Sequence, residues 1–489
     1  MRSAERSDAS HGKRLRVCIL SSEAVPFAKT GGLADVAGAL PKSLREHGAD
    51  AFLALPLYEQ IDRRLLSDQI IDNLEVEWPG GSRRASVWYS DATGAPTFLI
   101  DAPEYFARAG IYGYRDDHER YAFFSRAALA LCKRLGAPPD IIHGNDWHCG
   151  FAAAEIHARR RFDSYYSNTR TLFSIHNLAY QGVFDPAALP GLGFASDEER
   201  NLFSMDGAAN ALKAGLMASD ALSTVSRRYA FEIQTSEHGY GLEWILRARR
   251  ERLIGITNGV DYDVWNPATD PHIAAHYDAH DLSGKQLCKL DLLRAFGLPE
   301  ESIDRPIIAS VSRLIAQKGY DLIRVAAGRM LEMNATFIAL GSGAREYEDF
   351  LQSLRDYAPQ QVGIYKGFSE TLAHKIEAGA DVFLMPSLYE PCGLNQMYST
   401  RYGTVPLVRA TGGLDDTVQD FERASGTGNG FKFEAYSASA LLEKIGEALY
   451  CYREPDVWRK IQLNGMRVDN SWNAVAGRYM ELYRAVAGN

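Results

Sequence analysis

Short apolar segments alternate with longer amphipathic segments along most of this chain. The short segments are rich in β-branched residues, and this pattern predicts strand–helix–strand units with parallel sheets. In the first half, the expected strands are residues 15–21, 51–55, 97–100, 140–143, 171–175, 221–225 and 253–257. In the second half, they are residues 307–311, 336–340, 362–365, 381–385 and 405–408. Two such series predict an α/β protein with two doubly wound, Rossmann-like domains.

A cluster of turn residues at 258–267 separates the two series and predicts a domain boundary. We expect an N-terminal domain over residues 15–260 and a C-terminal domain over residues 261–465. Residues 1–14 are polar and charged, and we expect them to form a flexible tail. A helical pattern near residues 475–487 predicts a last helix.

Composition narrows the class of protein. The chain has 489 residues, of which 46% are hydrophobic and 24% charged, as in globular proteins. A net charge of −9 and the lack of long basic runs argue against a nucleic-acid partner. The six cysteines show neither metal-ligand nor disulfide-framework spacing, and we expect reduced thiols. With no long apolar run and no leader-like start, we expect a cytoplasmic protein without a membrane partner.

Residues with chemically useful side chains follow the C-terminal ends of the expected strands. They are Lys29, His143, Asp146, His176, Asn177, Asn258, Arg313, Lys318 and Glu390. Ligands of open α/β sheets bind outside this edge of the sheet. We therefore expect both sets to serve one site, and this placement is a stronger argument than any single motif.

The run Lys29-Thr30-Gly31-Gly32 lies between an expected strand and an expected helix. Glycines allow close backbone approach to a ligand, and the helix start offers N–H groups to an anion. The residue order is not that of a Walker A loop. Taken alone, the run fits a phosphate or sugar-phosphate site and a tight turn with a solvated lysine equally well.

Arg313 and Lys318 follow the expected strand at 307–311. A guanidinium supplies a bidentate fork and an ammonium supplies a point charge, so a curved loop could direct both to one anion. Such a pair could neutralise a diphosphate leaving group without Mg²⁺. An isolated pair at this spacing would more often be an exposed basic turn, but its place after a buried strand favours function.

Glu390 begins the run Glu390-Pro391-Cys392-Gly393 between a strand and a helix. A carboxylate there could bind sugar hydroxyls and stabilise the oxocarbenium-like state of glycosyl transfer. The alternative, at least as good for this residue alone, is a first-turn carboxylate favoured by the helix dipole. The run 411–413 repeats the Thr-Gly-Gly of residues 30–32 and fits a second backbone nest.

Seven segments together resemble the family of bacterial glycogen synthases and starch synthases. They are residues 29–41, 145–147, 176–182, 258–261, 312–319, 390–396 and 411–414. The segments follow the family's order, and the resemblance covers roughly residues 15–485. It implies the GT-B fold, in which two Rossmann-like domains face each other across a deep interdomain cleft. A C-terminal helix, here within residues 466–489, would pack back on the N-terminal domain.

The resemblance also implies an activity, which is retaining transfer of α-D-glucose from ADP-glucose to the non-reducing 4-hydroxyl of an α-1,4-glucan such as glycogen. The C-terminal domain would bind the donor and the N-terminal domain the acceptor, with no metal or other cofactor. Arg313 and Lys318 would hold the diphosphate, and Glu390 would support the transition state. His176 and Asp146 would line the sugar side. The remaining substrate-binding residues would be Lys29, Gly31, Gly32, Asp35, Asn258, Phe368, Gly393, Leu394, Thr411, Gly412 and Gly413.

Other hypotheses stay open beside this one. A related GT-B transferase could use UDP-glucose or another acceptor, a GT-B nucleotide-sugar epimerase would need no polymer, and a glucan-binding protein would release no ADP. Phe368 stands where bacterial members of the family often carry Tyr, so stacking on the nucleotide would survive but a hydroxyl contact would not. The oligomeric state, the strictness for ADP-glucose, and the choice between a front-face route and a covalent intermediate for retention are left open.

Overall fold

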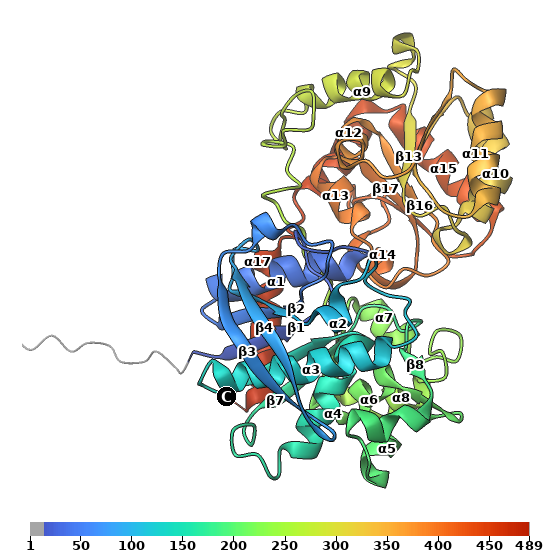
Figure 1. The fold of residues 1–489 in the computed structure, drawn as a ribbon. Coiled ribbons are helices and arrows are strands. Elements are labelled where there is room, and N and C mark those ends of the chain that lie inside the picture. Colours follow the sequence, from blue (N-terminus) through green and yellow to red (C-terminus); the bar gives the residue numbers. More distant parts are fainter. Residues whose placement is uncertain (1–13, 489) are drawn as a thin grey trace, which may run out of the picture. The chain divides into compact units, whose positions relative to one another are not determined.

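The computed structural model describes residues 14–488, which form two compact units (Figure 1). The second unit consists of Thr224–Glu232 and Gly255–Ala474, and the first unit contains the other described residues. Residues 224–232, which we expected in the N-terminal domain, thus group with the second unit. The expected tail at 1–14 lies outside the described residues except for Arg14.

A nine-stranded sheet with the order β12-β11-β7-β6-β1-β2-β5-β4-β3 forms the centre of the first unit. Its strands are β1 Arg16–Leu20, β2 Asp50–Pro56, β3 Gln69–Trp78, β4 Gly81–Ser90, β5 Thr97–Asp101, β6 Ile141–Asn145, β7 Arg170–Ile175, β11 Ala221–Thr224 and β12 Leu253–Gly255. The run β7-β6-β1-β2-β5 is parallel. The edge pairs β5-β4 and β4-β3 are antiparallel. The parallel strands confirm the sequence prediction, which did not include the β3–β4 hairpin.

Helices and a small sheet complete the first unit. The helices are α1 Gly32–Glu46, α2 Pro103–Phe106, α3 Asp117–Arg134, α4 Gly150–Arg159, α5 Asp197–Phe203, α6 Ala211–Ala218, α8 Glu243–Ala248 and, from Val475 onward, α17 Trp472–Ala487. The small antiparallel sheet contains β8 Val183–Phe184, β10 Ala208–Asn210 and β9 Ser204–Met205. Helix α17 contacts the large sheet through Tyr483, whose hydroxyl lies 2.8 Å from Nδ1 of the buried His143.

The second unit has a six-stranded, fully parallel sheet with the order β15-β14-β13-β16-β17-β18. Its strands are β13 Ile307–Val311, β14 Thr336–Gly341, β15 Val362–Lys366, β16 Val382–Met385, β17 Val405–Arg409 and β18 Phe431–Phe433. Its helices are α7 Arg227–Glu232, α9 Ser283–Ala295, α10 Tyr320–Glu332, α11 Arg345–Tyr357, α12 Glu370–Gly379, α13 Asn395–Arg401, α14 Gly412–Thr417, α15 Ala438–Tyr452 and α16 Pro455–Met466. Only the short β18 was absent from the strand prediction for this half of the chain.

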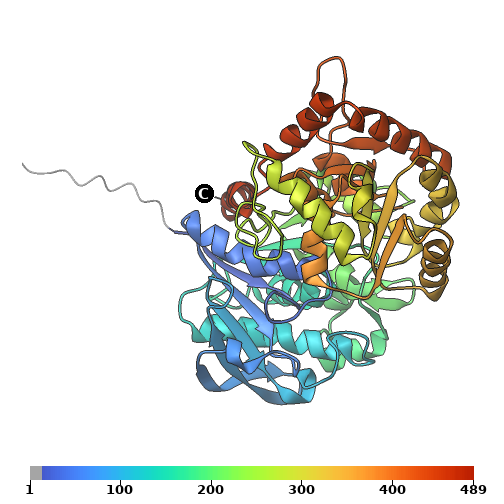
Figure 2. The same cartoon turned by 90° about the horizontal axis from the view of Figure 1, so that it is seen from above.

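Apolar residues on both faces explain why the strands of this second sheet were recognisable. Ile308 and Phe337 belong to a core that includes residues of α10, α11 and α15. Ile307 and Ile338, which point to the opposite face, pack with residues of α9 and α12. Helices therefore cover both faces, as Figures 1 and 2 show. A strand buried on both faces reads as a continuous apolar run, and its period-2 alternation disappears.

The order of strands in the second sheet brings three loops together. Strands β13, β16 and β17 are neighbours and run parallel, so their carboxyl ends lie at one edge. The loop after β13 carries Arg313 and Lys318, the loop after β16 carries Glu390, and the loop after β17 carries 411–413. This edge is where ligands of doubly wound sheets bind.

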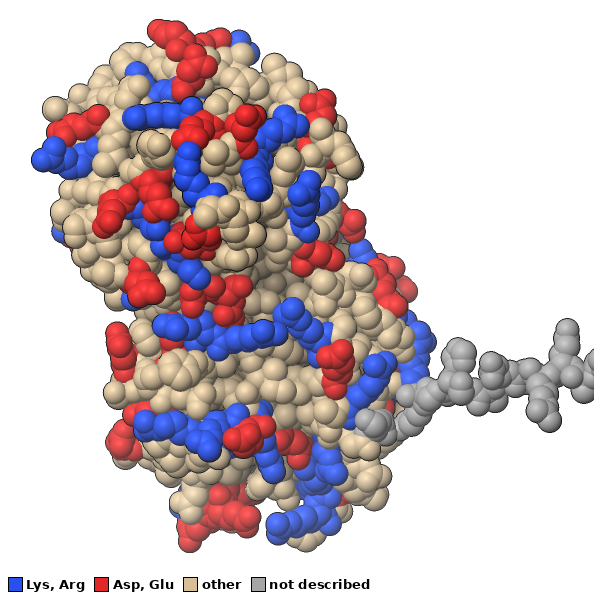
Figure 3. All heavy atoms as spheres, turned by 180° about the vertical axis from the view of Figure 1, so that it is seen from behind, with Lys and Arg blue, Asp and Glu red and all other residues tan. Residues whose placement is uncertain are grey.

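Acidic and basic side chains are interspersed on the molecular face drawn in Figure 3. This agrees with the mixed charge of the sequence, 53 Lys and Arg against 62 Asp and Glu. Within residues 14–488, every helix is too short or too polar to cross a lipid bilayer.

Candidate active site

The second unit joins two of the predicted catalytic side chains directly. Lys318 Nζ donates a hydrogen bond of 2.5 Å to Glu390 Oε2, although the residues are 72 positions apart. Ser387 Oγ donates to the same oxygen at 3.2 Å. The side chains of Lys318 and Glu390 are 19% and 8% exposed, so the pair is largely shielded from water but still reachable. Because the pair is not fully enclosed, either side chain could instead form an ion pair with a charged group of a substrate.

Arg313 lies in the same loop but is exposed. Its Nη2 donates to Gln317 Oε1 at 3.2 Å, and Gln317 Nε2 donates to the carbonyl of Tyr389 at 3.1 Å. Gln317 thus connects the Arg313 side chain to the main chain next to Glu390. The guanidinium keeps most of its donors available for an anion.

The turn after Glu390 carries the other predicted groups of this loop. Gly393 has φ +73°, and Leu394 precedes the first residue of α13. The main chain of the buried Asn258 approaches the Cys392 sulfur, which places a third predicted residue beside this turn. Burial raises the pKa of the Cys392 thiol to about 12, so this thiol is a packing group and not a nucleophile.

The predicted Thr411-Gly412-Gly413 segment packs beneath the Glu390 turn. The N–H of Gly413 donates to the carbonyls of Glu390 and Pro391, each at 3.1 Å. Gly412 has φ +46°, and a Cβ at this residue would lie 1.9 Å from the carbonyl oxygen of Glu390. Only glycine satisfies both the backbone conformation and the close approach.

Phe368 lies between β15 and α12 and is 74% exposed. An exposed aromatic ring at the carboxyl end of a parallel strand can stack on a nucleobase. The structure thus leaves its predicted role available.

In the first unit, the structure joins Asp146 and His176, which follow the adjacent strands β6 and β7. Asp146 Oδ1 accepts the backbone N–H of His176 at 2.7 Å. Asp146 has φ +56°, a conformation that costs a side-chain-bearing residue about 1–3 kcal/mol and often marks a functional site. The ring of His176 is held by Asn145, whose Oδ1 lies 2.9 Å from Nε2.

Burial determines the charge of these two groups. It raises the pKa of Asp146 to about 7, although the backbone N–H groups of His176 and Asn177 oppose the shift. Burial also lowers the pKa of His176 to about 4, so this imidazole is neutral at pH 7. This pair therefore combines a neutral imidazole with a carboxyl group that is only partly ionised at pH 7, and both can form hydrogen bonds with the hydroxyls of a sugar.

The predicted Lys29 loop is held through Glu23, a residue that the motif search missed. Lys29 Nζ donates to Asp35 Oδ1 at 2.7 Å, and both Gly31 and Gly32 are exposed at the start of α1. The backbone N–H and the hydroxyl of Thr30 donate to Glu23 Oε2 at 2.5 and 2.8 Å. Glu23 lies three residues after the end of β1, so the strand-end rule applied to the other residues would have found it.

Tyr112 is a second residue that sequence reasoning missed. Its hydroxyl lies 2.8 Å from Ser22 Oγ, and its ring stacks on His148 with centroids 4.7 Å apart. Burial raises the pKa of Tyr112, and the charges of Glu23 and Asp146 add to the shift, which places these two carboxyl groups near its hydroxyl. Tyr112 belongs to a loop without a motif, so no sequence signal distinguishes it.

Two family models match the chain. Residues 16–248 match the starch synthase catalytic domain, and residues 299–462 match glycosyl transferases group 1. The second match covers the β13–β18 sheet and the Lys318–Glu390 pair.

Relatives match over nearly the whole length. Glycogen synthase 1 of Geobacter sulfurreducens is 42% identical, and the match covers 96% of both chains. The glycogen synthase of Geobacillus stearothermophilus is 43% identical over 96% of this chain and 97% of its own.

Solved structures agree with these matches. The catalytic domain of starch synthase IV from Arabidopsis thaliana, bound to ADP and acarbose, is 33% identical, with a TM-score of 0.89 over 97% of this chain and all of that one. A sucrose-phosphate synthase from Thermosynechococcus elongatus, 20% identical with a TM-score of 0.59, shares the fold. The expected two-domain GT-B architecture is confirmed. The chain belongs to the glycogen and starch synthase family of glycosyltransferases, and glycogen synthesis is the activity that this membership assigns to it.

Proposed function

We propose that this glycosyltransferase elongates glycogen by moving α-D-glucose from ADP-glucose to the non-reducing 4-hydroxyl of an α-1,4-glucan, with retention of configuration. The 2.5 Å contact between Lys318 and Glu390 supports this most directly. It places a cation for a diphosphate beside a carboxylate for a developing oxocarbenium ion, which are the two charges that glycosyl transfer from a nucleotide sugar creates.

The second unit binds the donor in this proposal. Arg313 and Lys318 neutralise the diphosphate, Gly393 and Leu394 offer main-chain N–H groups, and Phe368 stacks on the base. A starch synthase that is 33% identical was solved with ADP, which supports ADP as the departing nucleotide. Because these two side-chain cations would neutralise the diphosphate without a metal ion, we expect activity to persist in EDTA.

The first unit binds the acceptor glucan. The neutral His176, the Asp146 carboxyl and the Lys29–Asp35 loop supply hydrogen bonds to sugar hydroxyls. In the transfer itself, the bond from the anomeric carbon to the diphosphate oxygen breaks and the bond to the acceptor oxygen forms. The proton of the acceptor hydroxyl passes to the leaving diphosphate. Glu390 stabilises the positive charge that builds on the glucose ring between these events.

The decisive experiment offers radiolabelled ADP-glucose and UDP-glucose, each with glycogen, to the wild type and to Lys318→Ala. We expect label in the polymer mainly from ADP-glucose, and a large loss in the variant. Transfer from UDP-glucose alone would identify a related transferase. Conversion of a nucleotide sugar without any polymer product would identify an epimerase. Glycogen binding without release of nucleotide would identify a binding protein.

Two accompanying proposals concern the setting of the reaction. We place the enzyme in the cytoplasm, where the six cysteines, all of them free and buried in the structure, would stay reduced. Fractionation of cells with an antibody against the chain tests this. Its substrates are a nucleotide sugar and a glucan, and sizing the purified protein would establish its oligomeric state.

A further inference from the structure

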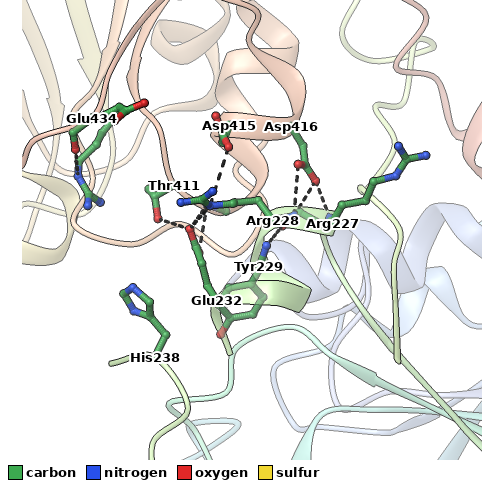
Figure 4. A network of polar contacts seen from close by, with 12 residues as sticks. Arg227, Arg228, Tyr229, Glu232, His238, Thr411, Asp415, Asp416 and Glu434 are labelled. Carbon is green, nitrogen blue, oxygen red and sulfur yellow. Dashed lines mark hydrogen bonds and ion pairs between the residues drawn. The ribbon is translucent and has the colours of Figure 1, made fainter. Parts of the chain in front are cut away.

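A short segment that follows β11 is built into the second unit. Helix α7 (Arg227–Glu232) belongs to this unit although the sequence around it belongs to the first. Its N-terminus is capped by Asp416 of α14, whose carboxylate accepts the N–H groups of Arg227 at 2.5 Å and Arg228 at 3.2 Å (Figure 4). The two short helices are thus joined by hydrogen bonds from main-chain N–H groups of α7 to a side chain of α14.

The other end of α7 holds the turn at 411–413. The carboxylate of Glu232 accepts the N–H of Gly412 at 3.1 and 3.2 Å, and the hydroxyl of Thr411 donates to it at 3.4 Å. Arg228 Nε lies 3.1 Å from the same carboxylate, and this ion pair, drawn in Figure 4, balances its charge. With its side chain only 8% exposed, Glu232 is shielded from water and keeps a fixed geometry.

The turn held by Glu232 is in direct contact with the main chain of Glu390. The N–H of Gly413 donates to the Glu390 carbonyl, and the space at Gly412 would not admit even a methyl group against that carbonyl. A shift of the turn therefore displaces the backbone that carries the Glu390 carboxylate, because no gap separates the two segments.

The start of α7 supports the Glu390 turn a second time. Ser226 Oγ donates to the carbonyl of Pro391 at 2.7 Å and accepts the N–H of Tyr229 at 3.1 Å. Ser226 is fully buried, so this hydroxyl serves the interior and not the solvent. One segment thus supports the residue after Glu390 directly and Glu390 itself through the turn at 411–413.

We propose that Glu232 and Ser226 are positioning residues for glucosyl transfer, acting through Gly412 and Pro391 to hold the Glu390 carboxylate where the reaction needs it. Neither residue touches the reacting atoms. The inference rests on the proposed function, because it takes Glu390 as the group that stabilises the transition state. It assigns a role in the donor half to residues that the sequence places among those of the acceptor half.

The test compares Glu232→Ala, Glu232→Gln and Ser226→Ala with the wild type, in glucose transfer from ADP-glucose to glycogen. We expect Glu232→Ala to lower kcat about tenfold with a smaller change in the KM for ADP-glucose, because misplacement by a fraction of an ångström weakens transition-state stabilisation. Glu232→Gln keeps an acceptor for the Gly412 N–H and should recover kcat to within about threefold of the wild type. Ser226→Ala loses only one hydroxyl and should lower kcat about threefold. This variant should still fold, so it tests the inference even where Glu232→Ala does not fold.

Asp381→Ala is the matched control. Asp381 is a buried carboxylate of the same unit that accepts the backbone N–H of Ile307 at 2.8 Å and pairs with Lys289 at 2.7 Å, at the opposite end of β16 from Glu390. It should lower Tm about as much as Glu232→Ala while kcat of the folded fraction stays within about twofold of the wild type. Wild-type kcat in Glu232→Ala and Ser226→Ala, or equal kcat losses in Glu232→Ala and Asp381→Ala, would overturn the inference. A wild type without transfer from ADP-glucose would instead refute the proposed function.

Discussion

Glu390 of the second unit and Asp146 of the first are shielded carboxyl groups that follow parallel strands, and the two groups have different surroundings. Glu390 of the second unit receives a hydrogen bond from the Lys318 ammonium. Asp146 of the first unit receives one from the backbone N–H of His176, and burial raises its pKa to about 7. The surroundings of Glu390 suit an anionic substrate, because the cationic side chains there can pair with it. The surroundings of Asp146 suit a neutral sugar, which needs hydrogen bonds and little charge.

The strongest challenge to this comparison is Glu390→Ala. We expect kcat to fall about 10³-fold, because the carboxylate faces the positive charge of the transition state. The KM for ADP-glucose should change by less than about threefold, since the donor gains this interaction mainly in the transition state. Steady-state kinetics measures both, with the exposed Glu370→Ala as the control. Equal losses in turnover and donor binding would contradict the assigned role.

Lys318→Ala should have the next largest effect. Loss of the cation should lower kcat/KM for ADP-glucose about 10²-fold, because the departing diphosphate loses a counter-charge. The Glu390 carboxylate would also stay shielded without its cation, so the free energy of unfolding should fall by about 3 kcal/mol. Lys444→Ala, which breaks a pair with Asp420 of 3.1 Å in the same unit, should leave activity at the wild-type level. Unchanged kinetics with ADP-glucose in Lys318→Ala would remove the distinction between the units.

Asp146→Asn tests the other environment through pH. The folded protein keeps the Asp146 proton up to about pH 7, whereas the unfolded chain loses it near pH 4. The contribution of this proton to stability is therefore complete below about pH 4 and is lost as pH rises to about 7. Relative to Asp146→Asn, the free energy of unfolding of the wild type should fall by about 2 kcal/mol between pH 4 and pH 7. This is less than the full pKa difference would give, because polar neighbours relax when the carboxyl group ionises.

Denaturant unfolding of both proteins from pH 4 to pH 8 provides this measurement. The difference between the two proteins is needed because His176, whose pKa burial lowers to about 4, contributes with the opposite sign in part of the same window. A constant difference across the whole range would show that Asp146 is already ionised at acidic pH.

Phe368→Ala should have the smallest effect and should be confined to the donor. Loss of stacking should raise the KM for ADP-glucose about fivefold and leave kcat and the KM for glycogen unchanged. Phe368→Tyr should behave as the wild type does, because the ring is retained. An increased KM for glycogen in Phe368→Ala would place the ring on the acceptor and would blur the division between the units.

Burial explains why β13 and β14 were predicted from the sequence and β3 was not. The strands β13 and β14 are buried on both faces, and their continuous apolar runs were recognised. The edge strand β3 buries only Leu74, Val76 and Trp78, which alternate with exposed residues such as Glu75 and Glu77. Its first half is mostly exposed, so the alternating pattern is short and the apolar content low.

The site was predictable as a set of positions but not as a set of contacts. Strand ends and motifs identified Lys318, Glu390, Asp146 and His176, since a strand end is a local property of the chain. The hydrogen bond between Lys318 and Glu390 joins loops that only the strand order β13-β16 makes neighbours. Glu232 was assigned to the wrong half for the same reason, because grouping by sequence order cannot show that Asp416 caps its helix.

Helix α17 has a consequence for how this chain is made. The buried ring of His143 on β6 hydrogen-bonds to Tyr483, so this contact of the large sheet can form only after the residues of the second unit have been synthesised. The second unit ends at Ala474 and has all its residues earlier. During translation, the first unit therefore gains helix α17 only after the whole of the second unit has been synthesised.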